Sequence, residues 1–347
     1  MQKLASLFVA VVLSLGLFHE LRITGFSRFE DGNNYSWFMF ISSSYATNPQ
    51  DMPANWASRN LSCALAGAWF NAWGKPDQFV YTPESQDQRQ IIFKPQEQYK
   101  HCDMVASFYA LFYLITCVAL VGFLKKPLLP MLGTFASILC CSPAFLWPYL
   151  LPWDLPTMAV WTIIFLFYLW LKARPQLSRP WIYLAFAIIL GGLFKETVLV
   201  TALFLLAAPW KRSRQIATII ITVIASQLLN WLVCGAPPDW MFSFKEGSTE
   251  GGHKWNPLLL WPALFANVGS ITLLPLALWR RWKLDKDWQL PLTCAAFIGL
   301  TMINFLAWGI YNENRDWLEI APLAWILIAE YFPHFTLKIP AKQTAEV

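Results

Sequence analysis

The chain has 347 residues, of which 56% are hydrophobic and only 14% are charged, and it contains 20 tryptophans. Soluble domains carry roughly 25% charged residues, so this composition excludes an ordinary soluble globular protein. Several apolar stretches reach the roughly 17–20 residues that cross a hydrocarbon core of about 30 Å. The composition therefore predicts an all-α polytopic membrane protein whose single transmembrane domain covers residues 1–347.

The first apolar run begins after Lys3 and extends to Phe18. Such a run is typical of a signal peptide or of a first transmembrane helix. No small-residue cleavage pattern follows it, which favours a retained helix over residues 4–24.

About ten membrane segments are predicted along the chain, and segments five and six are the shortest. The ten ranges are 4–24, 104–124, 128–147, 155–171, 181–194, 197–210, 216–233, 257–279, 290–310 and 317–332. Short loops rich in Lys and Arg face the cytoplasm. Placing both termini inside puts the basic clusters at 125–126, 172–179, 211–214 and 280–286 on that side. The net charge of +5 is thus explained by membrane orientation, and no nucleic-acid partner is expected.

Two external loops follow from this topology. The first covers residues 25–103 and contains "NLSCALAGAWFNAWG", which predicts a short interfacial helix with Trp69 and Trp73 at headgroup level. The second covers residues 234–256 and is rich in glycine and small polar residues, so we expect it to be mobile. Cys63 and Cys102 both fall in the first loop, and a disulfide between them is left open.

Segments five and six form a hairpin whose arms have 14 residues each, about 21 Å as α-helix. Its tip carries Lys195 and Glu196 below the far surface of the membrane. Charges at that depth need one another, other helices or a water-filled cavity. Mutual neutralisation of the two residues is one interpretation, and an external cavity that descends into the membrane is the favoured one.

Ionisable groups gather at four segment ends on the predicted external side. They are Glu30, Asp31, Arg59, Asp154, Lys195, Glu196, Glu313, Arg315, Asp316 and Glu319. A carboxylate can accept a proton from an attacking hydroxyl, and Arg or Lys can hold a phosphate leaving group. The alternative is that these are solvated loop charges, although Asp154, Glu196 and Glu319 are closely flanked by apolar sequence. P-loop, GxGxxG and HExxH motifs are absent from the sequence.

The order of these motifs resembles the GT-C superfamily of integral membrane glycosyltransferases, and in particular its bacterial mannosyltransferase-like members. "DGNNY" resembles the family's D-G-x-x-Y, here Asp31 and Tyr35, and the loop pattern that ends in an arginine falls on Arg59. The acidic entry to the fourth helix falls on Asp154. "LFKETVLV" is similar to the family's (R/K)-E-T hairpin, and "ENRDWLEIAP" is similar to its E-x-R entry to the last helix.

The resemblance implies an inverting transferase that moves one sugar from a polyprenyl-phosphate donor to a lipid or glycan acceptor. It would act on the external, periplasmic face of a bacterial inner membrane. The general base would be Asp31, with Glu30 or Asp154 orienting the acceptor or donor. The donor would be bound by the motif residues Arg59, Lys195, Glu196, Glu313 and Arg315, and its phosphate would be held by the three basic ones. No cofactor or metal is expected; if a divalent cation is used, its ligands would be Asp31 and Asp154.

Other classes of protein remain as alternatives. A lipid-linked glycan flippase or another transporter would also explain buried charges among many helices, but transporters often show paired interrupted helices and here one interrupted hairpin is visible. A surface-glycan polymerase or ligase would be expected to have its largest external loop later in the chain. An envelope scaffold would not need carboxylates at one external site.

Overall fold

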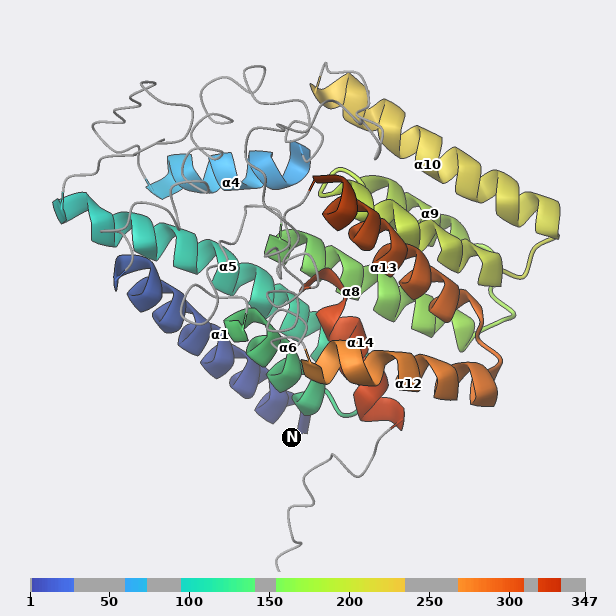
Figure 1. Ribbon diagram of the computed structural model, residues 1–347, viewed down its shortest axis with the longest axis horizontal. Helices are drawn as coiled ribbons and strands as arrows, with labels where there is room; N and C mark the ends of the chain where they lie inside the picture. Colours follow the sequence, from blue (N-terminus) through green and yellow to red (C-terminus); the bar gives the residue numbers. More distant parts are fainter. Residues whose placement is uncertain are drawn as a thin grey trace, which may run out of the picture.

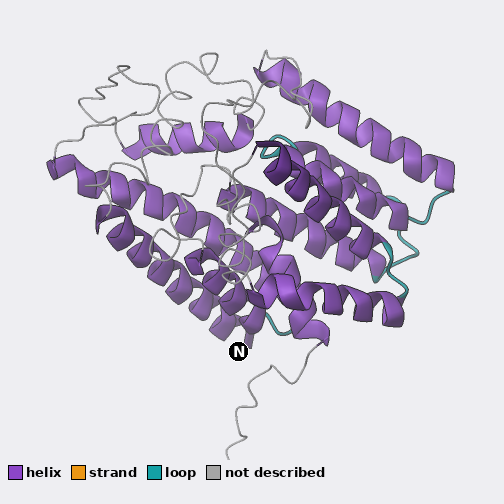
Figure 2. Ribbon diagram, in the orientation of Figure 1, coloured by secondary structure: helices purple, strands orange, loops and turns teal. Residues whose placement is uncertain are grey.

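The computed structural model describes residues 2–27, 60–73, 95–140, 154–234, 268–308 and 318–331, and within these ranges the chain is helical and has no strand (Figure 2). The helices form one bundle (Figure 1). In chain order they are α1 (Gln2–Ser27), α4 (Asn60–Trp73), α5 (Pro95–Phe123), α6 (Leu128–Cys140), α8 (Asp154–Lys172), α9 (Pro180–Gly191), η2 (Glu196–Ala207), α10 (Arg212–Cys234), α12 (Val268–Asp285), α13 (Gln289–Trp308) and α14 (Ala321–Tyr331).

Every predicted membrane segment overlaps one of these helices, and the remaining one, α4, is the helix expected in the first loop. Four helices are long and apolar enough to cross a membrane, namely α1, α5, α8 and α10. An all-helical membrane protein is therefore supported. The count of ten crossings and the placement of both termini inside stay predictions.

Two helices extend beyond the predicted membrane segments. The apolar span of α5, Cys102–Phe123, agrees with the predicted segment 104–124, but the helix itself begins at Pro95, and proline loses no hydrogen bond at the first position of a helix. The last residues of the predicted loop of residues 25–103 are therefore helical. Helix α12 continues to Asp285 rather than 279, and Lys283 lies in its last turn, where a cation is favoured by the helix dipole.

Helices α1 and α5 pack antiparallel along their length (Figure 1). An ion pair between Arg22 and Asp103 joins them near one end, and the Lys3 ammonium donates to the carbonyl of Gly122 near the other, at 3.4 Å. The outward faces of the bundle are apolar: Phe8 on α1 is 69% exposed and Leu232 on α10 is 79% exposed. Such faces are expected where lipid replaces water.

Helix α8 lies in the middle of the bundle and packs against α5, α9, η2 and α14. Its side chains make the aromatic core. The Tyr168 ring stacks on Phe204 of η2 with centroids 4.2 Å apart, and Trp161 meets Phe297 of α13 edge to face at 5.3 Å. All four rings are buried, so α8 is the element against which the other helices are positioned.

The second arm of the predicted hairpin, η2, is a 3₁₀ helix rather than an α-helix. Its β-branched residues, among them Thr197, Val198, Val200 and Thr201, have restricted side-chain rotamers and favour α-helix less. At about 2.0 Å per residue, 12 residues of 3₁₀ helix extend about 24 Å, against about 18 Å for the same number in α9.

Candidate functional site

Three of the predicted site residues lie in the described part of the chain: Asp154, Lys195 and Glu196. The other five lie outside the described residues, and these are Glu30, Asp31, Arg59, Glu313 and Arg315. The geometry of the candidate site is therefore built on the hairpin tip and on the helix ends around it.

Lys195 at the hairpin tip forms a buried ion pair with Glu319. Its Nζ lies 2.6 Å from Glu319 Oε1, and the two side chains are 5% and 1% exposed. The Thr197 hydroxyl donates to the second carboxylate oxygen, Glu319 Oε2, at 2.6 Å. Each oxygen of Glu319 thus has a partner from the hairpin, and removal of either charge would leave the other buried without compensation.

The ion pair of Lys195 with Glu319 joins groups that are 124 residues apart in the chain. Mutual neutralisation of Lys195 and Glu196, one interpretation of the tip, stays a prediction. Glu319 precedes α14 and had been noted only as an acid in apolar surroundings. The cavity interpretation of the same tip stays a prediction.

Helix α4 is attached directly to the hairpin tip. The Leu61 amide donates to the carbonyl of Leu193 at 3.0 Å, and the Ser62 hydroxyl donates to the carbonyl of Phe194, also at 3.0 Å. These carbonyls lie in the turn between the end of α9 at Gly191 and the start of η2 at Glu196, and the first turn of α4 supplies their donors. The helix expected in the first loop therefore begins at the Lys195 turn, and the predicted Arg59 immediately precedes its first residue in the chain.

Asp154 is the first residue of α8 and is 1% exposed. A carboxylate at a helix N-terminus is favoured by the positive end of the helix dipole. The C-terminal ends of α8 and α14 meet in one polar cluster, because Tyr168 and Arg281 both bind Asp287 and Arg281 also binds Glu330. Asp154 begins α8 and Glu319 precedes α14, so each belongs to the end of its helix opposite to that cluster.

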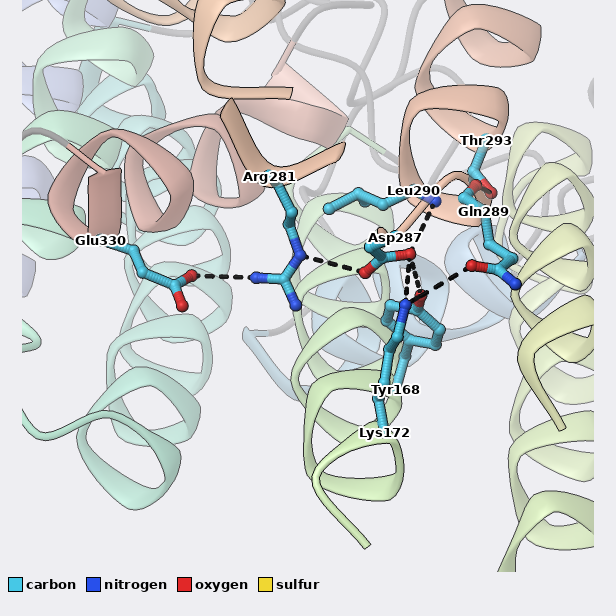
Figure 3. Close-up of polar contacts among 8 residues, drawn as sticks. All are labelled: Tyr168, Lys172, Arg281, Asp287, Gln289, Leu290, Thr293 and Glu330. Atoms are coloured by element: carbon cyan, nitrogen blue, oxygen red, sulfur yellow. Dashed lines mark hydrogen bonds and ion pairs between the residues drawn. The ribbon is translucent and has the colours of Figure 1, made fainter. Parts of the chain in front are cut away.

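That polar cluster, the Asp287 cluster, lies in the short link between α12 and α13 (Figure 3). The Asp287 side chain is fully buried. Its Oδ1 lies 2.6 Å from Lys172 Nζ and accepts from the Tyr168 hydroxyl at 2.7 Å, and its Oδ2 lies 3.0 Å from Arg281 Nε. The link turns sharply at Lys286, whose φ of 53° is left-handed, and Asp287 follows at once.

Burial raises the pKa of Asp287, but hydrogen bonds from Lys172 and Tyr168 and the charges of Lys172 and Arg281 outweigh it. The pKa therefore lies below the ordinary value of 3.8. Asp287 is thus an anion shared by two cations, and it ties α8 to the link between α12 and α13. The sequence placed Lys172 and Arg281 only in predicted cytoplasmic charge clusters and gave no signal of the cluster that they form with Asp287.

Three of the four basic clusters predicted to share one side of the membrane lie at one end of the bundle. Lys172, Arg281 and Arg212 all lie around the α12–α13 link, since Arg212 covers the Trp288 ring at 5.3 Å. In Figure 1 the links α8–α9, η2–α10 and α12–α13 lie together at the right, and α4 lies at the upper left. The candidate site is therefore remote from the basic end.

Cys63 and Cys102 are both free and buried, so the disulfide left open by the sequence does not form. Within the described ranges, no group of three His, Cys, Asp or Glu side chains is placed to hold a metal ion. The suggested cation ligand Asp31 lies outside those ranges.

Comparison with known proteins found no matching family model, no matching curated protein and no matching solved structure.

Proposed function

We propose that the protein is a membrane glycosyltransferase that moves a sugar from a polyprenyl-phosphate donor to a lipid or glycan acceptor. Its site would open on the external, periplasmic side of a bacterial inner membrane. The observation that carries the proposal is the buried Lys195–Glu319 pair, because it holds a cation at a helix-hairpin tip, beside the first-loop helix and remote from the basic end of the bundle.

In the proposed reaction an acceptor hydroxyl attacks the anomeric carbon of the donor sugar. The bond between that carbon and the phosphate oxygen breaks, so the configuration inverts and polyprenyl phosphate leaves. Asp31 takes the proton of the hydroxyl as general base. Asp154 orients a substrate hydroxyl, and the negative charge that develops on the phosphate is stabilised by Lys195 together with Arg59 and Arg315.

Glu319 has a defined role in this proposal. In the absence of donor it neutralises Lys195, which would otherwise be a buried unpaired cation. A donor phosphate brings its own negative charge and can replace the carboxylate as the partner of Lys195. Thr197, which donates to Glu319, would then keep the displaced carboxylate hydrogen-bonded.

The test separates a structural ion pair from a phosphate ligand. Lys195→Met and Glu319→Gln are prepared singly and together, and each is measured for thermal stability in detergent and for transfer of radiolabelled sugar from total polyprenyl-phosphate sugars. Each single variant should lose stability, and the double variant should recover most of it because no buried charge remains uncompensated.

Under the proposal the stable double variant still fails to transfer sugar, because the phosphate has lost its cation. Wild-type transfer by that variant would refute the role of Lys195.

Asp31→Asn should abolish transfer without changing stability, and full activity of this variant would refute the role of Asp31 as general base. Movement of a lipid-linked glycan across liposomes without any glycosylated product would favour a flippase instead.

A further inference from the structure

A short pattern occurs three times among the 20 tryptophans of the chain, in each case where a helix meets a basic link. It reads Trp-x-(Lys/Arg)-x-(Lys/Arg). The three copies are "WLKAR" at residues 170–174, "WKRSR" at 210–214 and "WRRWK" at 279–283. They belong to the end of α8, the start of α10 and the end of α12.

The residue at the third position of each copy contacts the link between α12 and α13. Lys172 and Arg281 bind Asp287 at 2.6 and 3.0 Å, and Arg212 lies over the neighbouring Trp288 ring. Two of these three cations are therefore neutralised by the same buried carboxylate. The third, Arg212, is exposed and lies on the Trp288 ring, one residue from Asp287 in the chain.

The second basic residue of each copy behaves differently, since it lies on the tryptophan of its own copy. The Arg174 guanidinium carbon is 4.5 Å from the Trp170 ring centroid, that of Arg214 is 4.6 Å from Trp210, and Lys283 Nζ is 5.3 Å from Trp279. A spacing of four residues places both members on one face where the copy is helical. Within the described ranges none of the three outer cations has a carboxylate partner.

Indole rings and basic side chains are suited to the same depth of a membrane, the headgroup region. Trp279 is 51% exposed and Trp288 is 39% exposed, so this end of the bundle presents aromatic surface outward. An indole ring and a cation lying on it can bind two parts of one lipid. The ring fits the glycerol region, and the cation without a carboxylate partner fits the phosphate.

We propose that the three Trp-linked cations, Arg174, Arg214 and Lys283, form a binding surface for the headgroups of anionic phospholipids. The surface lies at the opposite end from the candidate site and does not depend on glycosyl transfer. Its occupant is a bilayer lipid rather than free phosphate, because each cation is paired with an apolar ring and not with further hydrogen-bond donors.

The test uses the purified full-length chain in detergent, titrated with phosphatidylglycerol, phosphatidylcholine or inorganic phosphate. Bound lipid is counted by native mass spectrometry, and the melting temperature is recorded in parallel. The triple variant R174Q/R214Q/K283Q removes the Trp-linked cations. The matched triple variant K126Q/R179Q/K211Q removes three exposed cations for which the structure gives no aromatic contact within the described ranges.

We expect phosphatidylglycerol to bind and raise the melting temperature, and phosphatidylcholine and phosphate to have little effect. Loss of one Trp-linked cation should weaken apparent affinity about fivefold, and loss of all three about a hundredfold. The matched variant should retain most of the binding. Should the triple variant fold poorly, the three single variants give the same comparison.

Equal losses in the two triple variants would overturn the proposal, because net charge alone would then explain binding. Equal binding of phosphatidylglycerol and phosphatidylcholine by the wild type would also overturn it. A phosphate effect as large as that of phosphatidylglycerol would show an ion site instead of a lipid surface and would refute the assignment.

Discussion

Replacement of Asp287 by asparagine should cost the protein far more stability than replacement of its exposed neighbour Glu330 by glutamine. The Asp287 side chain is fully buried and faces two cations, of which Arg281 is 8% exposed and Lys172 is 27% exposed. Removing one charge from a buried ion network leaves the others uncompensated and typically costs about 3–5 kcal/mol. Glu330 is 49% exposed, so its pair with Arg281 should contribute about 0–1 kcal/mol.

The assay is reversible unfolding in mixed micelles, followed by tryptophan fluorescence as the fraction of denaturing detergent rises. The pH dependence gives a second check. Because the folded pKa of Asp287 is lowered from 3.8, its stabilising contribution is present above that value and is lost as the pH falls through the folded pKa. The difference between wild type and Asp287→Asn should therefore be largest above about pH 4 and should shrink in acid. A loss no greater than that of Glu330→Gln would refute the reasoning.

Three further variants test packing around α6, with a control on α5, and the contact at the hairpin tip. A Cβ at Gly133 would lie 2.1 Å from the Trp325 ring, so Gly133→Ala should destabilise by about 1–3 kcal/mol, whereas Gly122→Ala meets nothing within 4 Å and should be neutral or stabilising in the same unfolding assay. Equal effects of the two would contradict the close approach. Ser62→Ala removes the hydrogen bond to Phe194 and should cost about 0.5–1.5 kcal/mol, with faster hydrogen exchange at the start of α4. Unchanged exchange there would show that the hydroxyl does not attach α4 to the tip.

The positions of the helices could be predicted from the sequence because long apolar runs mark them. Every predicted segment overlaps a helix, and α4 occupies the predicted stretch of the first loop. The type of helix was harder to predict from the sequence than its position. The arm from Glu196 was expected to be α-helical, and its β-branched residues gave only a weak local signal for the 3₁₀ form.

Charge pairing could not be predicted, because sequence proximity says little about which groups meet across a bundle. Lys195 stands next to Glu196 but forms its described ion pair with Glu319. Asp287 stands among basic residues in a short link, a place where loop charges are usually solvated, and yet its side chain is fully buried. In both cases the partner comes from another helix, so the pairing follows from the packing of α8, η2 and α14 rather than from a local pattern.

The basic residues from which a membrane orientation is predicted divide into two structural classes. Counting Lys and Arg in short loops treats Lys172 and Arg174 alike. In the fold, however, Lys172 binds the buried Asp287, whereas Arg174 lies on an indole without a carboxylate partner in the described ranges. Neutralising Lys172 should therefore destabilise the contact of α8 with the α12–α13 link more than it changes the orientation of the protein in the membrane. Neutralising Arg174 should leave the fold intact and change only how the protein meets the bilayer. Two residues that count equally in a topology prediction thus have different roles: Lys172 contributes to stability, and Arg174 contributes to lipid contact.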